Sequence, residues 1–365
     1  MQYDADEIDL QLLHLLQIAP RISWTSAAEI LRVSANALAA RWSRLHEAGL
    51  AWISVYPNPV SSGHLTAIVD VDCIPRQCGQ VAAQLIVDPR VVSVEECAGG
   101  RDLLLTVMVS DLPSLSAFVL DSLNTMEGVT GTRTRILTAI YAEGSRWRLD
   151  ALDPAQQREA RAARDVHGGQ RTSFAVTDQW PLIEALSRDG RSPVAELART
   201  TGGNASTARR HLAQLLNSGM LSVRCDITPA ITGWGVACSW LARTLPAERP
   251  QSVAKLCRLS QLRVCFSLTG PANLGFTVYS RTMSGLAAFE DTLGTQLPTL
   301  QCLETMIHLR THKRMGWITT TDGRCTGEVI VPDVFRPTAH FADGEVFGGA
   351  ADRRLHQATG TEDTC

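Results

Sequence analysis

Apolar residues at the start of the chain recur first with the period of a helix and then with that of a strand. The pattern predicts helices over 6–18, 25–31 and from Ser34 to about 47, followed by a strand over 50–56. Pro20 ends the first helix, Ser34 is a favourable N-cap for the third, and Gly49 terminates it. Two short helices, a tight turn, a capped helix and a strand are typical of a winged helix-turn-helix.

A different pattern follows Gly63, in which alternating strands are interleaved with two helical stretches. The predicted order is strand 64–72, helix 75–86, strands 91–98 and 103–109, helix 114–123 and strand 129–140. This βαββαβ order is ferredoxin-like, with an antiparallel sheet and both helices on one face. The other face is partly apolar and uncovered within one module, so we expect modules to pair through their sheets.

The whole arrangement occurs twice. A shift of 170 residues aligns Leu12 with Leu182, Arg21 with Arg191 and Gly49 with Gly219, and a shift of 171 then aligns Gly99 with Gly270 and Thr106 with Thr277. In the second copy the predicted helices are 181–187, 194–200 and 204 or 206 to 216, with a strand over 221–227 and a βαββαβ order through 234–243, 251–259, 262–268, 274–280, 283–293 and 300–310. Two diverged copies of a unit of about 145 residues are therefore expected.

The fold class that follows is α+β, with two copies of a winged helix-turn-helix and a ferredoxin-like βαββαβ sensing module. The expected boundaries are 1–60 for the first winged helix, 61–145 for the first sensing module, 146–173 for a linker, 174–230 for the second winged helix, 231–312 for the second sensing module, 313–335 for an extended hairpin and 336–365 for a tail. The linker is polar and is expected to be part helical and part flexible, and the tail lacks periodicity and is expected to be disordered.

Composition excludes several classes of protein. Of the 365 residues 45% are apolar, which excludes a wholly disordered or fibrous chain. No apolar run reaches the roughly 18 residues of a membrane span, and the first residues are acidic rather than signal-like, so we expect a soluble, cytoplasmic protein. The ten cysteines are scattered without a CxxC pair, so we expect neither a disulfide framework nor a metal site.

Charge indicates a nucleic-acid partner only locally, because the formal net charge is −3. Each predicted third helix carries two arginines and no acid before its last turn, which suits a helix facing a DNA groove. The candidate DNA-binding residues are Ser34, Asn36, Ala37, Arg41 and Arg44 in the first copy and Asn204, Ser206, Thr207, Arg209 and Arg210 in the second. A winged helix used only for protein contacts is the alternative, and the glycines at 202 and 203 loosen the second turn.

The order of elements resembles the Lrp/AsnC (feast/famine) transcriptional regulators. The residues that carry the resemblance are Arg21-Ile22-Ser23, the turn into Ser34, Arg41-Trp42, Leu45, Gly49-Leu50, the stretch 91–102 ending Gly-x-x-Asp, and Gly128-Val129 through Thr134. The resemblance implies a regulator that binds DNA as dimers and higher assemblies, and that senses amino acids or related metabolites between sensing modules. A tandem chain would hold a dimer's worth of modules.

On this basis we expect a sequence-specific transcriptional regulator whose assembly and binding to double-stranded DNA respond to a small, amino-acid-like effector. The candidate effector-binding residues are Gly99, Gly100, Arg101 and Asp102 in the first copy and Gly270 and Asn273 in the second. Because Asn273 replaces the acid, a carboxylate that holds an amino group would lose its charge-assisted bond there. Homo-oligomers through the sensing modules and two unlike DNA half-sites are also expected.

Two alternatives remain at this stage. The sequence contains no GxSxG, HExxH or P-loop, and no cofactor is expected. Some relatives of this architecture are sirohaem decarboxylases, and a tetrapyrrole enzyme would need a cavity lined by arginine and histidine. Candidates for that lining are Arg133, Arg135, His308 and Arg310. A co-regulator that no longer binds DNA is the other alternative.

Overall fold

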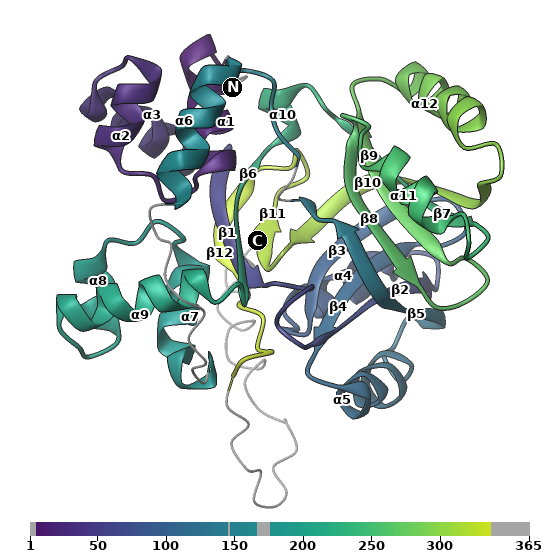
Figure 1. Ribbon diagram of the computed structural model, residues 1–365. Helices are drawn as coiled ribbons and strands as arrows, with labels where there is room; N and C mark the ends of the chain where they lie inside the picture. The colour runs from purple at the N-terminus through teal and green to yellow at the C-terminus, as the bar shows by residue number, and fades with distance from the viewer. Residues whose placement is uncertain (1–4, 145–146, 166–175, 337–365) are drawn as a thin grey trace, which may run out of the picture.

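The computed structural model describes residues 5–144, 147–165 and 176–336. Two helical units lie on one side of the molecule and a barrel of strands lies on the other, with a two-stranded ribbon between them (Figure 1). The predicted tail lies outside the described residues apart from position 336, and so does the 166–173 part of the predicted linker.

Each helical unit has the three helices that the sequence predicts. They are α1 (Glu7–Ile18), α2 (Trp24–Leu31) and α3 (Ala35–Glu47) in the first unit, and α7 (Trp180–Arg188), α8 (Val194–Thr200) and α9 (Ala205–Asn217) in the second, where the 3₁₀ turn η3 (Val176–Gln179) precedes α7. Side-chain caps fix most of the starts, because Asp6, Ser23 and Ser34 each accept a hydrogen bond from the backbone N–H three residues later.

The strand after each third helix pairs with the other copy, where a wing hairpin within one copy was expected. β1 (Ala51–Pro57) and β6 (Leu221–Ile227) form an antiparallel ribbon with Ser54 opposite Arg224 at its centre. The two residues are 170 apart, so the axis relating the two copies passes through this pair. A short helix, α10 (Pro229–Thr232), follows β6.

Two equivalent arginines tie the helical units together across the same axis. The Arg21 guanidinium donates to the carbonyls of Gly190 and Ser192, and the Arg191 guanidinium donates to the carbonyls of Pro20 and Ile22. Because each arginine satisfies carbonyls at the turn that carries the other, the repeat observed in the sequence is a pseudo-twofold contact in space.

The described part of the predicted linker is largely helical, as the helical part of that prediction requires, and it is docked on the first helical unit. α6 (Pro154–Asp165) packs on α1 and α2, with Leu152 and Ala160 fully or nearly buried. His14 Nδ1 accepts the backbone N–H groups of Ala151 and Leu152, at 3.2 and 3.0 Å. This segment is therefore part of the first helical unit rather than a spacer.

The two sensing modules each have the predicted βαββαβ order. Their strands are β2 (Leu65–Cys73), β3 (Val91–Ala98), β4 (Leu103–Val109), β5 (Val129–Ala142), β7 (Val236–Arg243), β8 (Leu262–Leu268), β9 (Leu274–Ser280) and β10 (Gln301–Arg314). Their helices are α4 (Cys78–Ile86), α5 (Leu112–Ser116) with its π-helical continuation η1 (Ala117–Leu123), α11 (Arg249–Leu256) and α12 (Met283–Gln296). A C-terminal hairpin of β11 (Trp317–Thr319) and β12 (Cys325–Val329) extends the sheet from β10.

The modules join edge to edge and close into a barrel. β5 pairs with β2 of its own module and with β8 of the other, and β10 pairs with β7 of its own module and with β3 of the other. The eight strands therefore form a ring in the order β10-β3-β4-β2-β5-β8-β9-β7, with the helices packed outside (Figure 1). Closure satisfies the edge strands and turns the uncovered face of each sheet inward, which accounts for the expected pairing of modules.

Candidate DNA-reading helices and an interior cavity

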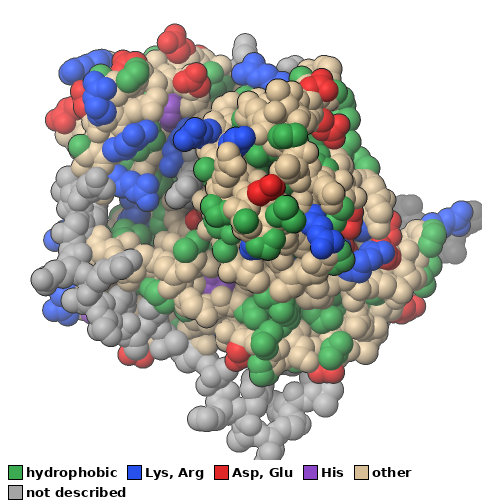
Figure 2. Space-filling model, turned by 45° about the vertical axis from the view of Figure 1, so that its right-hand side comes forward, with side chains coloured by type: hydrophobic (Ala, Val, Ile, Leu, Met, Phe, Trp, Pro, Cys, Tyr) green, Lys and Arg blue, Asp and Glu red, His purple; other side chains and the backbone are tan. Residues whose placement is uncertain are grey.

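The third helix of each helical unit buries one face and leaves the opposite face exposed. On α3 the buried residues Leu38, Trp42 and Leu45 pack inward, while Asn36 and Arg44 are exposed. Figure 2 shows basic and acidic side chains mixed on the part of the helical side that faces the viewer.

α9 repeats this arrangement with different side chains. Ala208, Leu212 and Leu215 are buried, and Ser206, Arg209 and Arg210 are exposed. The predicted DNA-binding residues Asn204 and Thr207 are joined in the N-cap, where the Asn204 side chain accepts the Thr207 N–H at 2.8 Å. The glycines of the preceding turn do not prevent α9 from forming a full helix.

Arg41 does not lie on the exposed face where the sequence places it. Its guanidinium forms ion pairs with Asp6 at 2.6 Å and with Asp9 at 2.7 Å, and these pairs raise the pKa of Arg41. Arg41 therefore ties α3 to the start of α1, and its contact with DNA stays a prediction. The remaining first-copy candidates are Ser34, which caps α3 through the Ala37 N–H, and the exposed Asn36 and Arg44.

The two loops predicted to bind an effector carry their acid and amide in the same structural role. The Asp102 carboxylate accepts the backbone N–H of Cys73 at 2.7 Å. At the equivalent position the Asn273 side chain accepts the Thr244 N–H at 3.0 Å and donates to its carbonyl at 2.8 Å. Because an amide serves this position as well as a carboxylate, the exchange of Asp for Asn leaves the anchoring of the loop intact.

The loop glycines lie on the outside of the barrel, but the neighbouring arginine turns inward. Gly99, Gly100 and Gly270 are exposed, and a Cβ built on Gly99 would lie 3.3 Å from the Thr305 carbonyl oxygen of the other module. Arg101 is only 5% exposed. Arg101 thus lies apart from the exposed glycines, and effector binding by these residues stays a prediction.

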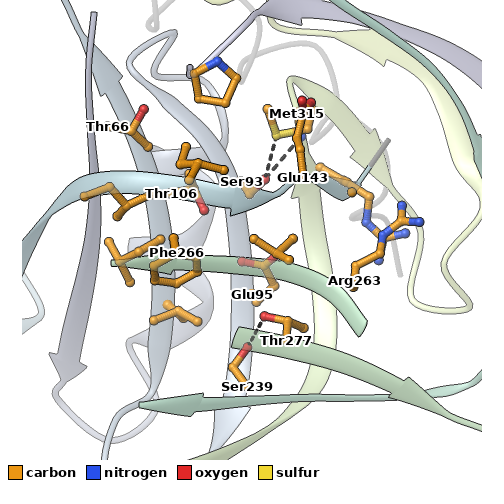
Figure 3. Close-up of a pocket in the computed structure, with 18 of the residues that line it drawn as sticks. Thr66, Ser93, Glu95, Thr106, Glu143, Ser239, Arg263, Phe266, Thr277 and Met315 are labelled. Atoms are coloured by element: carbon orange, nitrogen blue, oxygen red, sulfur yellow. Dashed lines mark hydrogen bonds between the residues drawn. The ribbon is translucent and has the colours of Figure 1, made fainter. Parts of the chain in front are cut away.

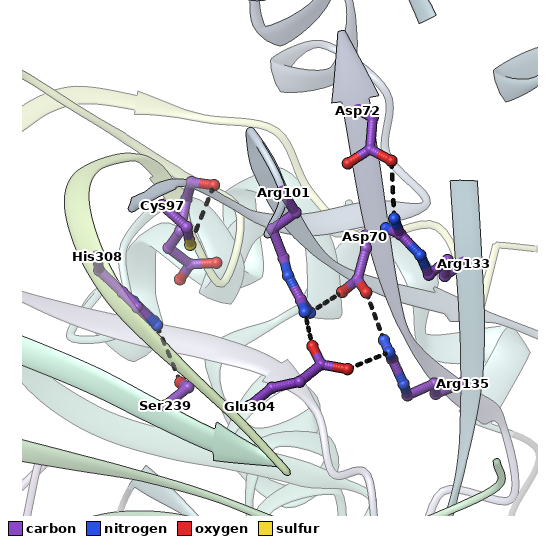
Figure 4. A network of polar contacts seen from close by, with 10 residues as sticks. Asp70, Asp72, Cys97, Arg101, Arg133, Arg135, Ser239, Glu304 and His308 are labelled. Atoms are coloured by element: carbon purple, nitrogen blue, oxygen red, sulfur yellow. Dashed lines mark hydrogen bonds and ion pairs between the residues drawn. The ribbon is translucent and has the colours of Figure 1, made fainter. Parts of the chain in front are cut away.

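Arg101 belongs to a charged quartet at one junction of the two modules, in which Asp70, Arg101 and Arg135 are buried and the Glu304 side chain is 40% exposed (Figure 4). Arg101 forms ion pairs with Asp70 and Glu304, and Arg135 forms ion pairs with the same two acids, at 2.5 Å to Asp70 and 3.4 Å to Glu304. The residues a shift of 171 away from Asp70, Arg101, Arg135 and Glu304 are Leu241, Ala272, Met306 and Arg133. Three of these belong to the apolar cluster inside the barrel, so the two junctions of the barrel are chemically unlike.

The barrel and the β1–β6 ribbon surround a partly open cavity of about 160 Å³ that residues of both copies line. Figure 3 shows Phe266 and Arg263 at different sides of it. The apolar lining residues are Pro59, Ile68, Leu104, Met108, Leu137, Ile140, Trp240, Leu241, Val264, Phe266, Met306 and Met315. The ribbon contributes Tyr56 and Arg224, so the cavity lies where the barrel meets the helical units.

Three arginines gather at the polar side of the cavity. Asp226 accepts from Arg224 at 2.8 Å and from Arg263 at 3.3 Å. Although burial alone would raise the pKa of Asp226, these two arginines hold it below its ordinary value. Arg314 also lines the cavity and donates to Thr311 Oγ1 at 3.4 Å.

Glu95 borders the cavity from β3. Burial raises the pKa of Glu95 to about 7, against an opposing effect of Arg314. The Glu95 side chain is partly exposed, because it lines the cavity (Figure 3). The second carboxylate at this side, Glu143, accepts hydrogen bonds from Tyr56 and Ser222.

None of these cavity residues is among the site residues predicted from the sequence. Glu95 lies within the predicted strand 91–98 and Arg263 within 262–268, two segments that are otherwise mostly apolar. A charge on the inward face of a half-buried strand is an available signal, but it becomes specific only when the inward face is known to enclose a cavity.

The four residues proposed to line a tetrapyrrole cavity are not brought together. Arg133 pairs with Asp72, Arg135 belongs to the charged quartet, and Arg310 lies 3.9 Å from Glu96. His308 alone of the four lines the cavity, where its Nε2 lies 2.9 Å from Ser239 Oγ. Burial, with a smaller effect of Arg314, lowers the pKa of His308 to about 4.

Within the described part of the chain no three His, Cys, Asp or Glu side chains are grouped as a metal site would require. No helix of that part is long and apolar enough to cross a membrane.

Comparison with known proteins matches both parts of the first copy to family models. The AsnC-type helix-turn-helix domain matches residues 6–46 and the Lrp/AsnC ligand binding domain matches residues 66–147. In the second copy the IclR helix-turn-helix domain matches residues 182–224. The chain is thus similar to a helix-turn-helix regulator with a ligand-binding domain, and it carries a second helix-turn-helix.

Curated relatives match over the length of one copy. An HTH-type transcriptional regulator of Pyrococcus horikoshii is 31% identical over 143 residues, which cover 39% of this chain and 90% of that protein. The regulator AldR of Mycolicibacterium smegmatis is 30% identical over 37% of this chain and 81% of its own length. The chain belongs to the Lrp/AsnC family of transcriptional regulators.

Among solved structures, the siroheme decarboxylase NirDL has the same overall arrangement. It is 12% identical, covers 85% of this chain and 93% of its own, and superimposes with a TM-score of 0.54. At this identity the likeness concerns the fold alone. It indicates that the paired arrangement of two helical units and two sensing modules occurs in another protein.

Proposed function

We propose that this protein is a sequence-specific DNA-binding transcriptional regulator in which a single chain supplies both reading helices of a dimer. The observation that carries the proposal is the pseudo-twofold pair of helical units, in which α3 and α9 each present an exposed polar face. Membership of the Lrp/AsnC family and the regulator names of its relatives support it.

The two reading helices are unlike, and we propose that their DNA half-sites are unlike as well. α3 presents Asn36 and Arg44, whereas α9 presents Ser206, Arg209 and Arg210. Side chains of this kind make base and phosphate contacts from a helix in the major groove, with half-sites about 34 Å apart for a twofold pair of helices. The target should therefore be an imperfect palindrome.

We further propose that the sensing modules respond to a small molecule and assemble with other copies of the chain. Exposed apolar side chains at equivalent positions of the two modules support assembly, because Ile74 corresponds to Leu245 and Leu112 to Met283. Sedimentation at increasing concentration tests it. Replacement of all four residues by serine should lower the apparent mass, and an unchanged mass would count against this surface.

The tetrapyrrole-enzyme alternative has one observation in its favour, the overall likeness to NirDL. The size of the cavity argues against it, because about 160 Å³ is below the roughly 300 to 1,000 Å³ of typical sites for drug-sized ligands. A tetrapyrrole is larger than such ligands. We therefore propose regulation rather than catalysis as the function.

The deciding experiment is selection of binding sequences from a random duplex pool with the purified full-length chain. A regulator should enrich two unlike half-sites at a fixed spacing, whereas an enzyme or a co-regulator would enrich no sequence. Affinity for the selected duplex is then measured against salt concentration.

Variants assign the contacts to the reading helices. Arg44→Ala and Arg209→Ala should each weaken binding about tenfold and reduce the salt slope by about 1, because each would remove a phosphate or base contact. Arg258→Ala is the matched control, since Arg258 is equally exposed but lies after α11 on the barrel. Equal effects of all three variants would contradict the assignment.

A further inference from the structure

We infer that the cavity inside the barrel binds a small organic anion with an apolar body, namely a monocarboxylate of about six to nine non-hydrogen atoms. The binding itself stands apart from the proposed function, whereas its effect on DNA rests on that function. Size sets the first limit, because an engineered apolar cavity of about 150 Å³ holds one benzene molecule. The cavity here measures about 160 Å³, and part of its wall is polar.

The division of the cavity lining sets the shape of the ligand. The apolar lining includes Ile68, Leu137 and Phe266, which suit a short hydrocarbon chain, and Figure 3 shows Arg263 at a different side of the cavity from Phe266. A ligand with one apolar end and one charged end would bury both against matching surface.

The charge at the polar side favours a carboxylate. Among the described residues, Arg224, Arg263 and Arg314 line this side together with the carboxylates of Glu95 and Glu143, and Asp226 lies behind them. Burial raises the pKa of Glu95 to about 7, which reduces its negative charge near neutral pH. Glu143 is already engaged by Tyr56 and Ser222, and Asp226 is shared by two arginines. Arg314 has a 3.4 Å contact with Thr311 and is free to turn to a carboxylate.

The pKa values of Tyr279 and Arg148 are both lowered by arginines, which indicates a positive potential near the polar side of the cavity. Burial would raise the pKa of the Tyr279 hydroxyl, yet Arg314, Arg263 and Arg224 together lower it. Burial and the charges of Arg164, Arg263 and Arg161 lower the pKa of Arg148 to about 10, which links the cavity arginines to basic residues on α6. The charge of Arg263 thus acts on Tyr279 in the cavity and on Arg148 ahead of α6.

An ammonium group is disfavoured at the same place. Glu95 is the one acid that could accept it, and its neighbours at the polar side are mainly guanidinium groups. A zwitterionic amino acid of the same shape would place its positively charged ammonium group among these guanidinium groups. We therefore assign the site to an acid without an amino group.

The position of the cavity gives the ligand a route to the reading helices. Tyr56 of β1 and Arg224 of β6 line the cavity, and β1 follows α3 after the turn at Gly49. A carboxylate that draws Arg224 away from Asp226 would change the ribbon that joins the two helical units. Binding and DNA affinity would then be coupled.

The test measures binding to the full-length chain, without DNA, by calorimetry. The probes are 4-methylpentanoate, leucine and 4-methylpentan-1-ol, which share one hydrocarbon body and differ in the charged group. The carboxylate should bind at least about tenfold tighter than the other two. Tighter binding of leucine would overturn the assignment in favour of a zwitterion held by Glu95, and no binding of any probe at millimolar concentration would overturn the site itself.

Variants on one strand localise the contact. Arg314→Gln should weaken 4-methylpentanoate about tenfold or more, whereas Arg310→Gln on the same strand should not, because Arg310 is exposed on the outside. Tyr279→Phe keeps the ring that packs on Trp147, so it is the second variant to test if Arg314→Gln fails to fold. It should lower the affinity for 4-methylpentanoate by a few-fold. Unchanged affinity in both variants would overturn the site. Failure of these binding tests leaves DNA binding intact, so it is distinguishable from failure of the proposed function.

Discussion

Gly49 and Gly219 end the two reading helices at equivalent positions with the same left-handed backbone, at φ of 67° and 73°. Their surroundings differ. A Cβ on Gly49 would lie 2.2 Å from the Cys325 carbonyl oxygen of β12, whereas the nearest atom to a Cβ on Gly219 is Ser61 Oγ at 3.8 Å. The first reading helix is thus held against the C-terminal hairpin, and the second is not.

Replacing each of these two glycines with alanine should separate the cost of a left-handed backbone from the cost of a steric clash with β12. Gly219→Ala should cost about 1 to 2 kcal/mol, the usual cost of a left-handed conformation for a residue with a Cβ. Gly49→Ala should cost clearly more, since it must also displace β12 and its hydrogen bond from Cys325 N–H to Gly49 O. Urea unfolding measures both, and equal losses would contradict the docking of β12 on this turn.

The charged quartet of Asp70, Arg101, Arg135 and Glu304 shows how the two modules have diverged at an element junction. At the equivalent junction, three of the four corresponding residues belong to an apolar cluster, whereas the quartet is joined by ion pairs. A buried ion pair is costly to break but is often replaceable as a whole by apolar residues of fitting shape. The residues at the equivalent junction of the same chain show which apolar side chains could replace the quartet.

Removing one member of the quartet should therefore do more damage than replacing all four. Asp70→Leu alone should cost about 3 kcal/mol or more, because it leaves two buried guanidinium groups without that partner. The fourfold variant Asp70→Leu, Arg101→Ala, Arg135→Met and Glu304→Arg copies the equivalent junction and should lie within about 1 kcal/mol of the natural protein. Thermal and urea unfolding decide, and a fourfold variant less stable than Asp70→Leu would contradict the argument.

Elements could be predicted from the sequence because they follow from local periodicity. The strands β4, β8 and β9 begin and end at the predicted residues, and α8 does as well. Alternation identifies the inward face of a strand, but it does not identify the neighbouring strand. Periodicity therefore could not predict that β5 pairs with β8 and β10 with β3 across the two modules, or that β1 pairs with β6.

The candidate sites were less predictable for the same reason. Helical spacing places Arg41 off the buried face, but it contains no information on Asp6 and Asp9, which approach from α1. Arg101 lies next to exposed glycines in sequence and is nevertheless buried against another module. A residue's exposure could be predicted where its own element determines it, and not where another element covers it.

At the scale of the whole molecule, duplication within one chain removes the requirement that both halves be identical. A dimer of identical chains would repeat every junction, whereas here one junction is charged and the other apolar, and the two reading helices differ. The cavity is asymmetric for the same reason, because Arg224 and Arg263 have no arginine at the equivalent positions Ser54 and Val92. The proposal that both the ligand and the DNA site are asymmetric rests on these differences between the copies.

Stability of the whole molecule should fall as the pH falls from about 6.5 to 4. Burial lowers the pKa of His14, His64 and His308 from 6.5 to about 4, so in this window the unfolded chain takes up protons that the folded chain refuses. Glu95 acts in the opposite sense, since its folded pKa of about 7 lies above the unfolded value and its unfavourable contribution lessens on acidification. Three histidines outweigh one glutamate, and the melting temperature should drop by at least about 5 °C between pH 7 and pH 5.

His14 allows a matched test of this pH dependence. Its Nδ1 accepts two backbone N–H groups that dock the 151–152 segment on α1, and protonation removes that acceptor. In His14→Asn the side-chain oxygen can still accept from Leu152 but cannot take up a proton. The variant should be less stable than the natural protein at pH 7.5, yet lose less stability on acidification. A variant with the same acid sensitivity as the natural protein would exclude His14 as a source of the effect.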